Sequence, residues 1–171
     1  MPAGGRNNRT WLLALVVVAL AIPAAAPAKD SLGMFGKWGA FRDPSVPRCY
    51  AIAKPSETSA GGTYSAFASI GTWPARDVRG QLHIRLSRKI SPAGAITLRM
   101  ADRRFELTGG GGDAWAQDRR MDAAIVAAMR SAPRLTVTAR DTQGQSFTDS
   151  YSLDGAATAM DAATVGCARL R

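Results

Sequence analysis

Apolar side chains recur at every second position in several short stretches of the chain, and glycine, proline or polar residues separate these stretches. This is the period of a β-strand with one buried face. The clearest case is residues 82–86, where Leu82, Ile84 and Leu86 alternate with His83 and Arg85. The same alternation predicts strands around residues 38–40, 50–52, 64–70, 95–100, 104–108, 135–139 and 147–153.

Residues 35–52 are predicted to form the first hairpin. Pro44 and Pro47 interrupt the alternation where a turn is needed, because proline lacks the N–H that pairs strands and restricts the residue before it. Residues 30–35 are expected to be a short lead-in without a strand. The polar segment 54–62 is expected to be a loop, and residues 141–144 a tight hairpin turn with Gly144 at the positive-φ position.

Two segments change to the period of a helix. Met121, Ile125 and Met129 fall on one helical face, with Asp118 as the expected N-cap and Pro133 closing the segment. A final helix, which Asp154 is expected to cap, carries the apolar residues Ala156, Met160, Ala163 and Cys167 on one face.

The predicted fold is therefore mainly β: an antiparallel β-sandwich of about eight short strands with two short helices. The four glycines at 109–112 are expected to break regular structure between the strands and the first helix. Neither an internal repeat nor a linker divides the chain, so we predict one domain.

The first 28 residues have the pattern of a secretory signal peptide. Arg6 and Arg9 precede twelve apolar residues at 11–22, and the small residues Ala26 and Ala28 follow. An uncleaved membrane anchor is the alternative, but twelve helical residues rise about 18 Å and a bilayer core measures roughly 30 Å. We predict cleavage after Ala28, a single β-sandwich-like domain over residues 29–171, and a periplasmic or secreted location.

Cys49 and Cys167 are the only cysteines. Two cysteines in an exported protein usually pair, and we predict a structural disulfide between them. The alternatives are a reactive thiol and a pair of metal ligands. Neither cysteine has a histidine beside it, and His83 is the only histidine, so the sequence does not supply the usual four zinc ligands and we expect no cofactor.

The chain carries a net charge of +9, which falls to +7 once Arg6 and Arg9 are removed with the signal peptide. Such a charge favours attraction to anionic polymers of the envelope, although solubilising surface charge is the simpler interpretation. The candidate anion-binding residues are those on one basic strand and in two arginine pairs. They are His83, Arg85, Arg88, Lys89, Arg103, Arg104, Arg119 and Arg120. The sequence has no stripe of basic residues interleaved with aromatic residues, so it does not indicate specific nucleic-acid binding.

No catalytic set is assembled by the sequence. His83 is the obvious general base, and Ser87 is expected on the same strand face, but four strand residues span about 13 Å. No Gly-x-Ser-x-Gly elbow is present, and residues 109–112 lack the Lys-Ser/Thr that follows a phosphate-binding loop.

Several short motifs follow one another in an order that is known from one protein family. The signal-peptide pattern precedes a Trp38 strand and Cys49-Tyr50; the strand at 104–107 precedes the helix at 122–129; and residues 151–160 (YSLDGAATAM) lead to Cys167. In this order the chain resembles the invasion-associated locus B family of alphaproteobacterial exported proteins. The family usually has a cysteine near residues 41–43 and an aromatic residue where Ala156 stands, so the chain would lie on a divergent branch.

The resemblance implies a periplasmic or surface β-rich protein that the family name links to host-cell invasion, and it brings no catalytic residues. We therefore predict a non-catalytic, envelope-associated binding or accessory protein, whose partner is an anionic polymer or a protein. A periplasmic hydrolase with a site built from sequence-distant residues is the alternative.

Overall fold

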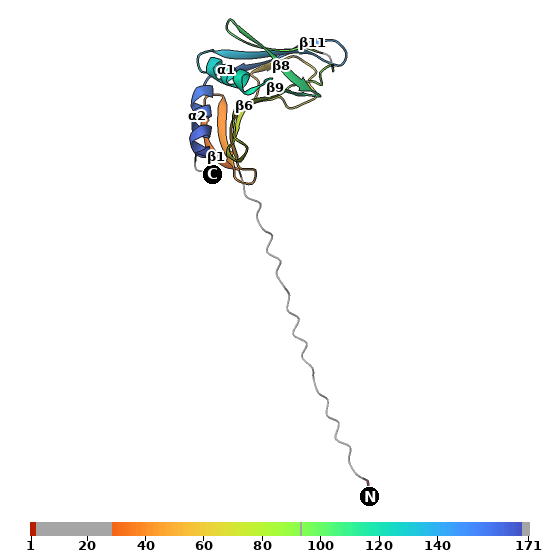
Figure 1. Ribbon diagram of the computed structural model, residues 1–171. Coiled ribbons are helices and arrows are strands. Elements are labelled where there is room, and N and C mark those ends of the chain that lie inside the picture. The colour runs from red at the N-terminus through yellow and green to blue at the C-terminus, as the bar shows by residue number, and fades with distance from the viewer. Residues whose placement is uncertain (3–28, 93, 169–171) are drawn as a thin grey trace.

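The structure, a computed structural model, describes residues 1–2, 29–92 and 94–168. The eleven strands of these residues form one antiparallel sheet in the order β1-β2-β3-β5-β6-β9-β8-β7-β10-β11-β4. Figure 1 shows the strands together with helices α1 and α2. The elements are β1 Asp30–Phe35, β2 Trp38–Asp43, β3 Arg48–Ala53, β4 Glu57–Thr58, β5 Phe67–Trp73, η1 Pro74–Arg76, β6 Val78–Arg85, β7 Ile96–Met100, β8 Arg103–Gly110, β9 Asp113–Trp115, α1 Arg119–Met129, β10 Arg134–Arg140, β11 Ser146–Ser152 and α2 Ala156–Cys167.

The sheet divides into two halves that pack as a sandwich. Strands β1, β2, β3, β5, β6 and β9 form the first half, and β7, β10, β11 and β4 form the second. The long strand β8 joins the halves, because it pairs with β9 on one side and with β7 on the other. Strand β4 follows β3 along the chain yet pairs with β11, so the segment after β3 crosses from one half to the other. The indole N–H of Trp38 on β2 also donates to the carbonyl of Ser152 on β11, at 2.9 Å. The predicted sandwich-like β fold is confirmed.

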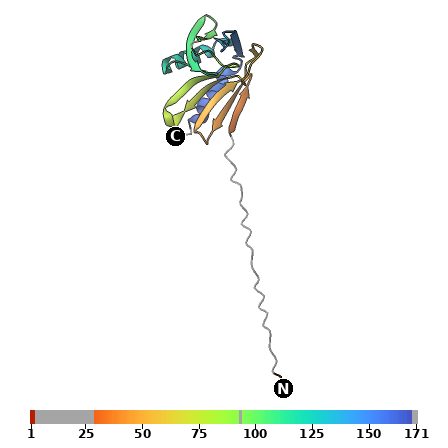
Figure 2. The ribbon, with the colours of Figure 1, turned by 90° about the vertical axis from the view of Figure 1, so that its right-hand side faces the viewer.

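Each helix covers part of the sheet. Helix α2 lies along one face of β1, β2, β3 and β5, and α1 lies against β6 and β8 (Figures 1 and 2). Asp118 caps α1 as predicted, because its carboxylate accepts the Met121 N–H at 2.8 Å. The prediction that Asp154 caps α2 is wrong. Gly155 is the N-cap, with φ 81°, and no side chain accepts a hydrogen bond there.

The core consists mainly of the apolar positions of the predicted alternations. Strand β3 is the exception, because Cys49, Ala51 and Ala53 are buried there, and not the predicted Tyr50 and Ile52. Leu82, Ile84 and Leu86 are fully buried, as are Leu135 and Val137. Trp38 is the largest fully buried side chain, at 0% exposure. These residues face away from water because every second strand residue points to the same side of the sheet.

Three of the eleven strands were not predicted. Residues 30–35 were expected to be a lead-in but form β1, whose apolar alternation is broken by a bulge around Gly33. The glycine run does not break the sheet either, since Gly109 and Gly110 pair with Ala114 and Asp113 in a β8–β9 hairpin. Gly111 supplies the positive φ of the turn, at 64°. The two-residue β4 lies within the predicted loop.

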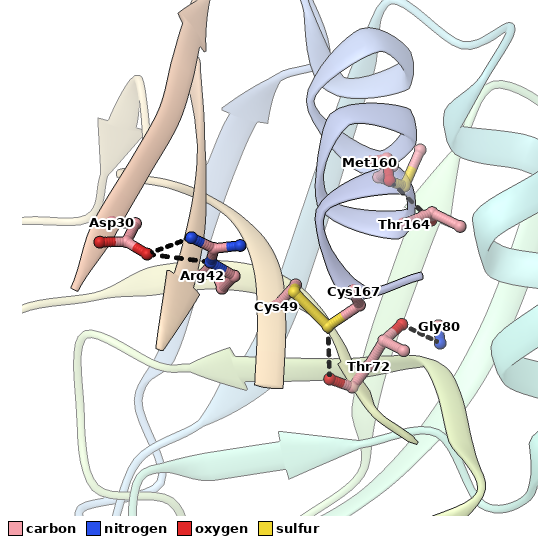
Figure 3. Close-up of a disulfide and its surroundings, with 8 residues drawn as sticks. All are labelled: Asp30, Arg42, Cys49, Thr72, Gly80, Met160, Thr164 and Cys167. Carbon is pink, nitrogen blue, oxygen red and sulfur yellow. Dashed lines mark hydrogen bonds and ion pairs between the residues drawn. A yellow bond between two sulfur atoms is a disulfide. The ribbon is translucent and has the colours of Figure 1, made fainter. Parts of the chain in front are cut away.

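The predicted disulfide is present. Cys49 lies on the buried face of β3, and Cys167 ends α2, with their Cα atoms 5.6 Å apart (Figure 3). The bond joins residues 118 positions apart and holds the last helix against the first half of the sheet. The predicted signal peptide at 1–28 lies, except for its first two residues, outside the described residues. None of the helices that the structure describes is long and apolar enough to cross a membrane.

Candidate functional site

The first half of the sheet has one face that α2 does not cover, and we call it the outer face. Cys49, Ala51 and Ala53 of β3 point to the buried side, where Cys49 reaches α2. Tyr50 and Ile52 therefore point the other way. Because strand pairing places Ile52 opposite Gly39 and Ser69, the outer face extends across β2, β3 and β5.

An apolar groove of about 670 Å³ lies on the outer face. Its walls come from β1, β2, β3, β5 and the segments beside them, and Met34 at its edge is 68% exposed. Gly39 forms part of the groove, where the side chains of Met34 and Phe41 lie directly over its Cα. The groove is lined by Met34, Lys37, Gly39, Phe41, Ile52, Ala53, Lys54, Pro55, Ser56, Ser65, Ala66, Phe67 and Ser152.

A polar cluster lies beside the groove on the same face, and we call it the His83 cluster. Asp113 contacts two side chains of β6: the His83 Nε2 atom lies 2.9 Å from Asp113 Oδ1, and Arg85 donates to Asp113 Oδ2. The His83 ring stacks on Trp115, with centroids 5.2 Å apart and planes 5° apart, and meets the edge of Phe67 at 5.2 Å.

Tyr64 anchors the loop before β5 to this cluster. The Arg85 guanidinium lies 4.5 Å from the centre of the Tyr64 ring. The same ring packs on Gly112, where a Cβ atom would come within 2.5 Å of it. The glycine run thus makes room for an aromatic side chain that holds the edge of the groove in place.

The structure does not bring the predicted anion-binding residues together. His83 and Arg85 share Asp113, Arg88 pairs with Asp141 at 2.9 Å, Arg104 pairs with Glu106 at 2.7 Å, and Arg119 pairs with Asp77 at 3.2 Å. They come from β6, the segment after it, β8 and the start of α1. Lys89, Arg103 and Arg120 are exposed and form no ion pair with any residue that the structure describes.

The lysines differ from most of the arginines in their ion pairing. The chain has four lysines, Lys29, Lys37, Lys54 and Lys89, and all are exposed. No ion pair within the described parts of the chain involves a lysine. Two of these four cations, Lys37 and Lys54, line the apolar groove. The groove therefore combines apolar walls with two lysines that form no ion pair with a carboxylate of residues 29–92 or 94–168.

Ser87 does not lie where the sequence pattern placed it. Strand β6 ends at Arg85, and Ser87 is buried, with its backbone N–H donating to Asp149 Oδ2 at 2.8 Å. Asp149 is fully buried, and burial raises its pKa. The Tyr151 pKa is also raised, first by burial and then by the Asp149 charge. This polar group is in the core, away from His83.

Few polar groups of the described residues contact the His83 ring. Of residues 29–92 and 94–168, only Asp113 forms a hydrogen bond with the His83 ring. Ser69 lies opposite His83 on β5, but its hydroxyl donates to the His83 carbonyl at 3.4 Å. Among the same residues, no three His, Cys, Asp or Glu side chains are placed to hold a metal ion.

The sequence interpretation missed the groove residues. Met34, Phe41 and Phe67 come from strands β1, β2 and β5, whose neighbours are known only when the strand order is known. One signal was available. On β3 the larger apolar side chains, Tyr50 and Ile52, alternate with the smaller Cys49, Ala51 and Ala53, so both faces of this strand are apolar.

The fold and the site define a mainly antiparallel β protein with a disulfide-tied C-terminal helix and an open apolar groove on the opposite face of the sheet. Residues 99–164 match the family model described as "Invasion associated locus B (IalB) protein", which confirms the family resemblance over that part of the chain. The match runs from the end of β7 into α2 and includes Asp113, but it ends before Cys167, and of the residues that line the groove it includes only Ser152. No curated protein and no solved structure matches the chain.

Proposed function

We propose that the protein is exported and acts in the cell envelope by binding another component through the outer face, without catalysing a reaction. The observation that carries this proposal is the apolar groove on the outer face, whose 670 Å³ lies within the range of about 300–1,000 Å³ typical of small-molecule sites. Export is supported by the signal-peptide pattern at 1–28, and the family match at 99–164 is consistent with it.

The arrangement of charges supports binding at the groove rather than at the arginines that form ion pairs. Arg85, Arg88, Arg104 and Arg119 each form an ion pair with a carboxylate of the fold. An anionic partner would have to compete with those carboxylates. The two groove lysines have no such competitor within the described residues, so an incoming anion meets them directly.

A periplasmic hydrolase is the second candidate, and one contact favours it. The 2.9 Å contact between His83 and Asp113 is the base-and-orienter pair of many hydrolases. Such a pair needs a nucleophile or a bound water in reach of the ring. Turnover of ester or phosphate substrates that His83→Ala removes would favour this candidate over the binding protein.

Site-directed photo-cross-linking tests the binding proposal. A photoreactive residue at Ser65, on the groove, is compared with one at Thr164, on α2, after irradiation with the envelope fraction of the protein's own cells. We expect a discrete product from Ser65 that persists at 0.5 M salt, about five times the ionic strength at which the Debye length is ~10 Å, and none from Thr164. The same products from both positions, or none from either, would contradict the proposal.

Export has its own test. Cells that express the full chain are fractionated, and the protein is analysed by intact mass and N-terminal sequencing. The proposal expects a chain that begins at Lys29 in the periplasmic or extracellular fraction. A full-length chain confined to the cytoplasm would refute it.

A further inference from the structure

The chemistry of the groove lining narrows the class of ligand. Most of the lining is apolar, from Met34, Phe41, Ile52, Pro55 and Phe67. Apolar walls stabilise a ligand by removing its hydrocarbon surface from water. The occupant must therefore carry a substantial apolar part, which a free phosphate, a nucleotide sugar or a polysaccharide does not.

The polar part of the lining is entirely uncharged or positive. Lys37 lies in the β1–β2 turn and Lys54 follows β3, while no aspartate or glutamate lines the groove. The carboxylate of Asp154 lies against Gly36, next to Lys37, but forms no ion pair with it in the described structure. The charge complementary to this lining is negative.

The hydroxyl groups of the lining are mostly engaged within the fold. Ser56 donates its hydroxyl to the Ser150 carbonyl, and the Ser152 hydroxyl accepts the Asp154 N–H. The two ammonium groups and the exposed Ser65 hydroxyl are the polar side-chain groups that remain for a ligand. Such a lining is suited to one anionic head group with an apolar tail and offers little to a peptide backbone, which needs a series of donors and acceptors.

We infer that the groove binds an anionic single-chain amphiphile of the lysophosphatidylglycerol type. Its acyl chain lies against Met34, Phe41, Ile52 and Phe67, and its phosphate lies between Lys37 and Lys54. This inference rests on the proposed binding function and names its ligand class. It assigns the lysines a role that the predicted anion-binding set, which includes neither Lys37 nor Lys54, does not.

Titration calorimetry with three probes tests each part of the inference. Lysophosphatidylglycerol is used below its micelle concentration, beside lysophosphatidylcholine with the same chain and glycerol 3-phosphate with no chain. We expect lysophosphatidylglycerol to bind the mature protein at least tenfold more tightly than either of the other two. If lysophosphatidylcholine binds as tightly as lysophosphatidylglycerol, the inferred role of charge is wrong. If glycerol 3-phosphate binds as tightly, the inferred role of the acyl chain is wrong.

Matched variants locate the site. The double variant Lys37→Glu/Lys54→Glu should bind lysophosphatidylglycerol about tenfold more weakly, with a smaller difference at high salt because salt screens exposed charges. Lys89→Glu makes the same substitution once, and so half of that charge change, at an exposed lysine outside the groove and should alter the dissociation constant less than twofold. Ala66→Trp, which fills the groove from the segment before β5, should weaken binding of the acyl chain at both salt concentrations.

Two further outcomes separate this inference from the function on which it rests. If Ser65 cross-links to an envelope protein while lysophosphatidylglycerol does not bind, the binding function holds and the amphiphile inference is wrong. If lysophosphatidylglycerol binds equally to wild type, the double lysine variant and Ala66→Trp, the ligand lies elsewhere and the inference is also wrong.

Discussion

The bond between Cys49 and Cys167 is expected to contribute a large part of the stability of the fold, because α2 has a weak apolar face. Three of the residues that α2 buries are Ala156, Ala159 and Ala163. Alanine side chains remove little apolar surface from water, and burial is worth about 25 cal/mol per Å². The helix therefore depends on the covalent link at its end more than a leucine-rich helix would.

The magnitude follows from the length of chain that the bond closes. The two cysteines are 118 residues apart, and the chain-entropy model gives about 5 kcal/mol for a loop of this size. One kcal/mol moves the melting temperature of a chain of 150–250 residues by about 2–4 °C. The variant Cys49→Ala/Cys167→Ala is thus expected to melt roughly 10–20 °C below the wild type.

Calorimetry or circular dichroism in non-reducing buffer measures this difference. Wild type melted after reduction should show the same loss, and hydrogen exchange across residues 156–167 should accelerate in both. Val165→Ala is the control, because Val165 lies on α2 but is 68% exposed, and its melting temperature should stay close to that of wild type. A double cysteine variant that melts within about 3 °C of wild type would refute the entropic argument.

Three other predictions concern the core and one turn. Asp149→Asn should remove part of the pH dependence of stability. Burial raises the folded-state pKa of Asp149 above 3.8, so the folded protein binds this proton more tightly than the unfolded chain, and the stability of the wild type falls as pH rises from 3.8 through the folded-state pKa. Denaturant melts of both proteins across that pH range measure this difference, and an identical pH dependence in the two proteins would contradict it. Gly111→Ala should lower the free energy of unfolding by about 1–2 kcal/mol, because φ at Gly111 is 64°. Gly110→Ala should leave it nearly unchanged, because Gly110 has no positive φ and no atom lies within 4 Å of an added Cβ. Urea melts that show equal losses of stability for the two variants would refute the backbone argument. Trp38→Phe should cost about 1–3 kcal/mol, since the Ser152 carbonyl loses its 2.9 Å hydrogen bond, and an unchanged urea midpoint would show that this contact is dispensable.

The features that depend on local pattern were predictable from the sequence. The alternation at 82–86 and 135–139 identified the buried positions of β6 and β10, and Asp118 was identified as the cap of α1. The disulfide was predictable for a different reason. A chain with two cysteines and a signal-peptide pattern allows one intramolecular pairing.

The features that depend on strand order were not predictable. Residues 109–112 were expected to break regular structure, but a glycine run can also serve a hairpin. The positive φ of Gly111 and the position of Tyr64 over Gly112 show why glycine is needed there. The groove depends on β3 pairing with β5 rather than with β4. Ser87 was placed on the surface because strict alternation was extended two residues past the end of β6.

Hydrogen exchange of the mature protein, with and without an extract of its own envelope, tests the central claim most directly. The account predicts that protection increases in the segments that line the groove, residues 34–41, 52–56 and 65–67, and not along α2. It also predicts that Ala66→Trp reduces this protection and that Lys89→Glu does not. Protection confined to α2, or no change in the groove segments, would show that the outer face is not where the protein binds.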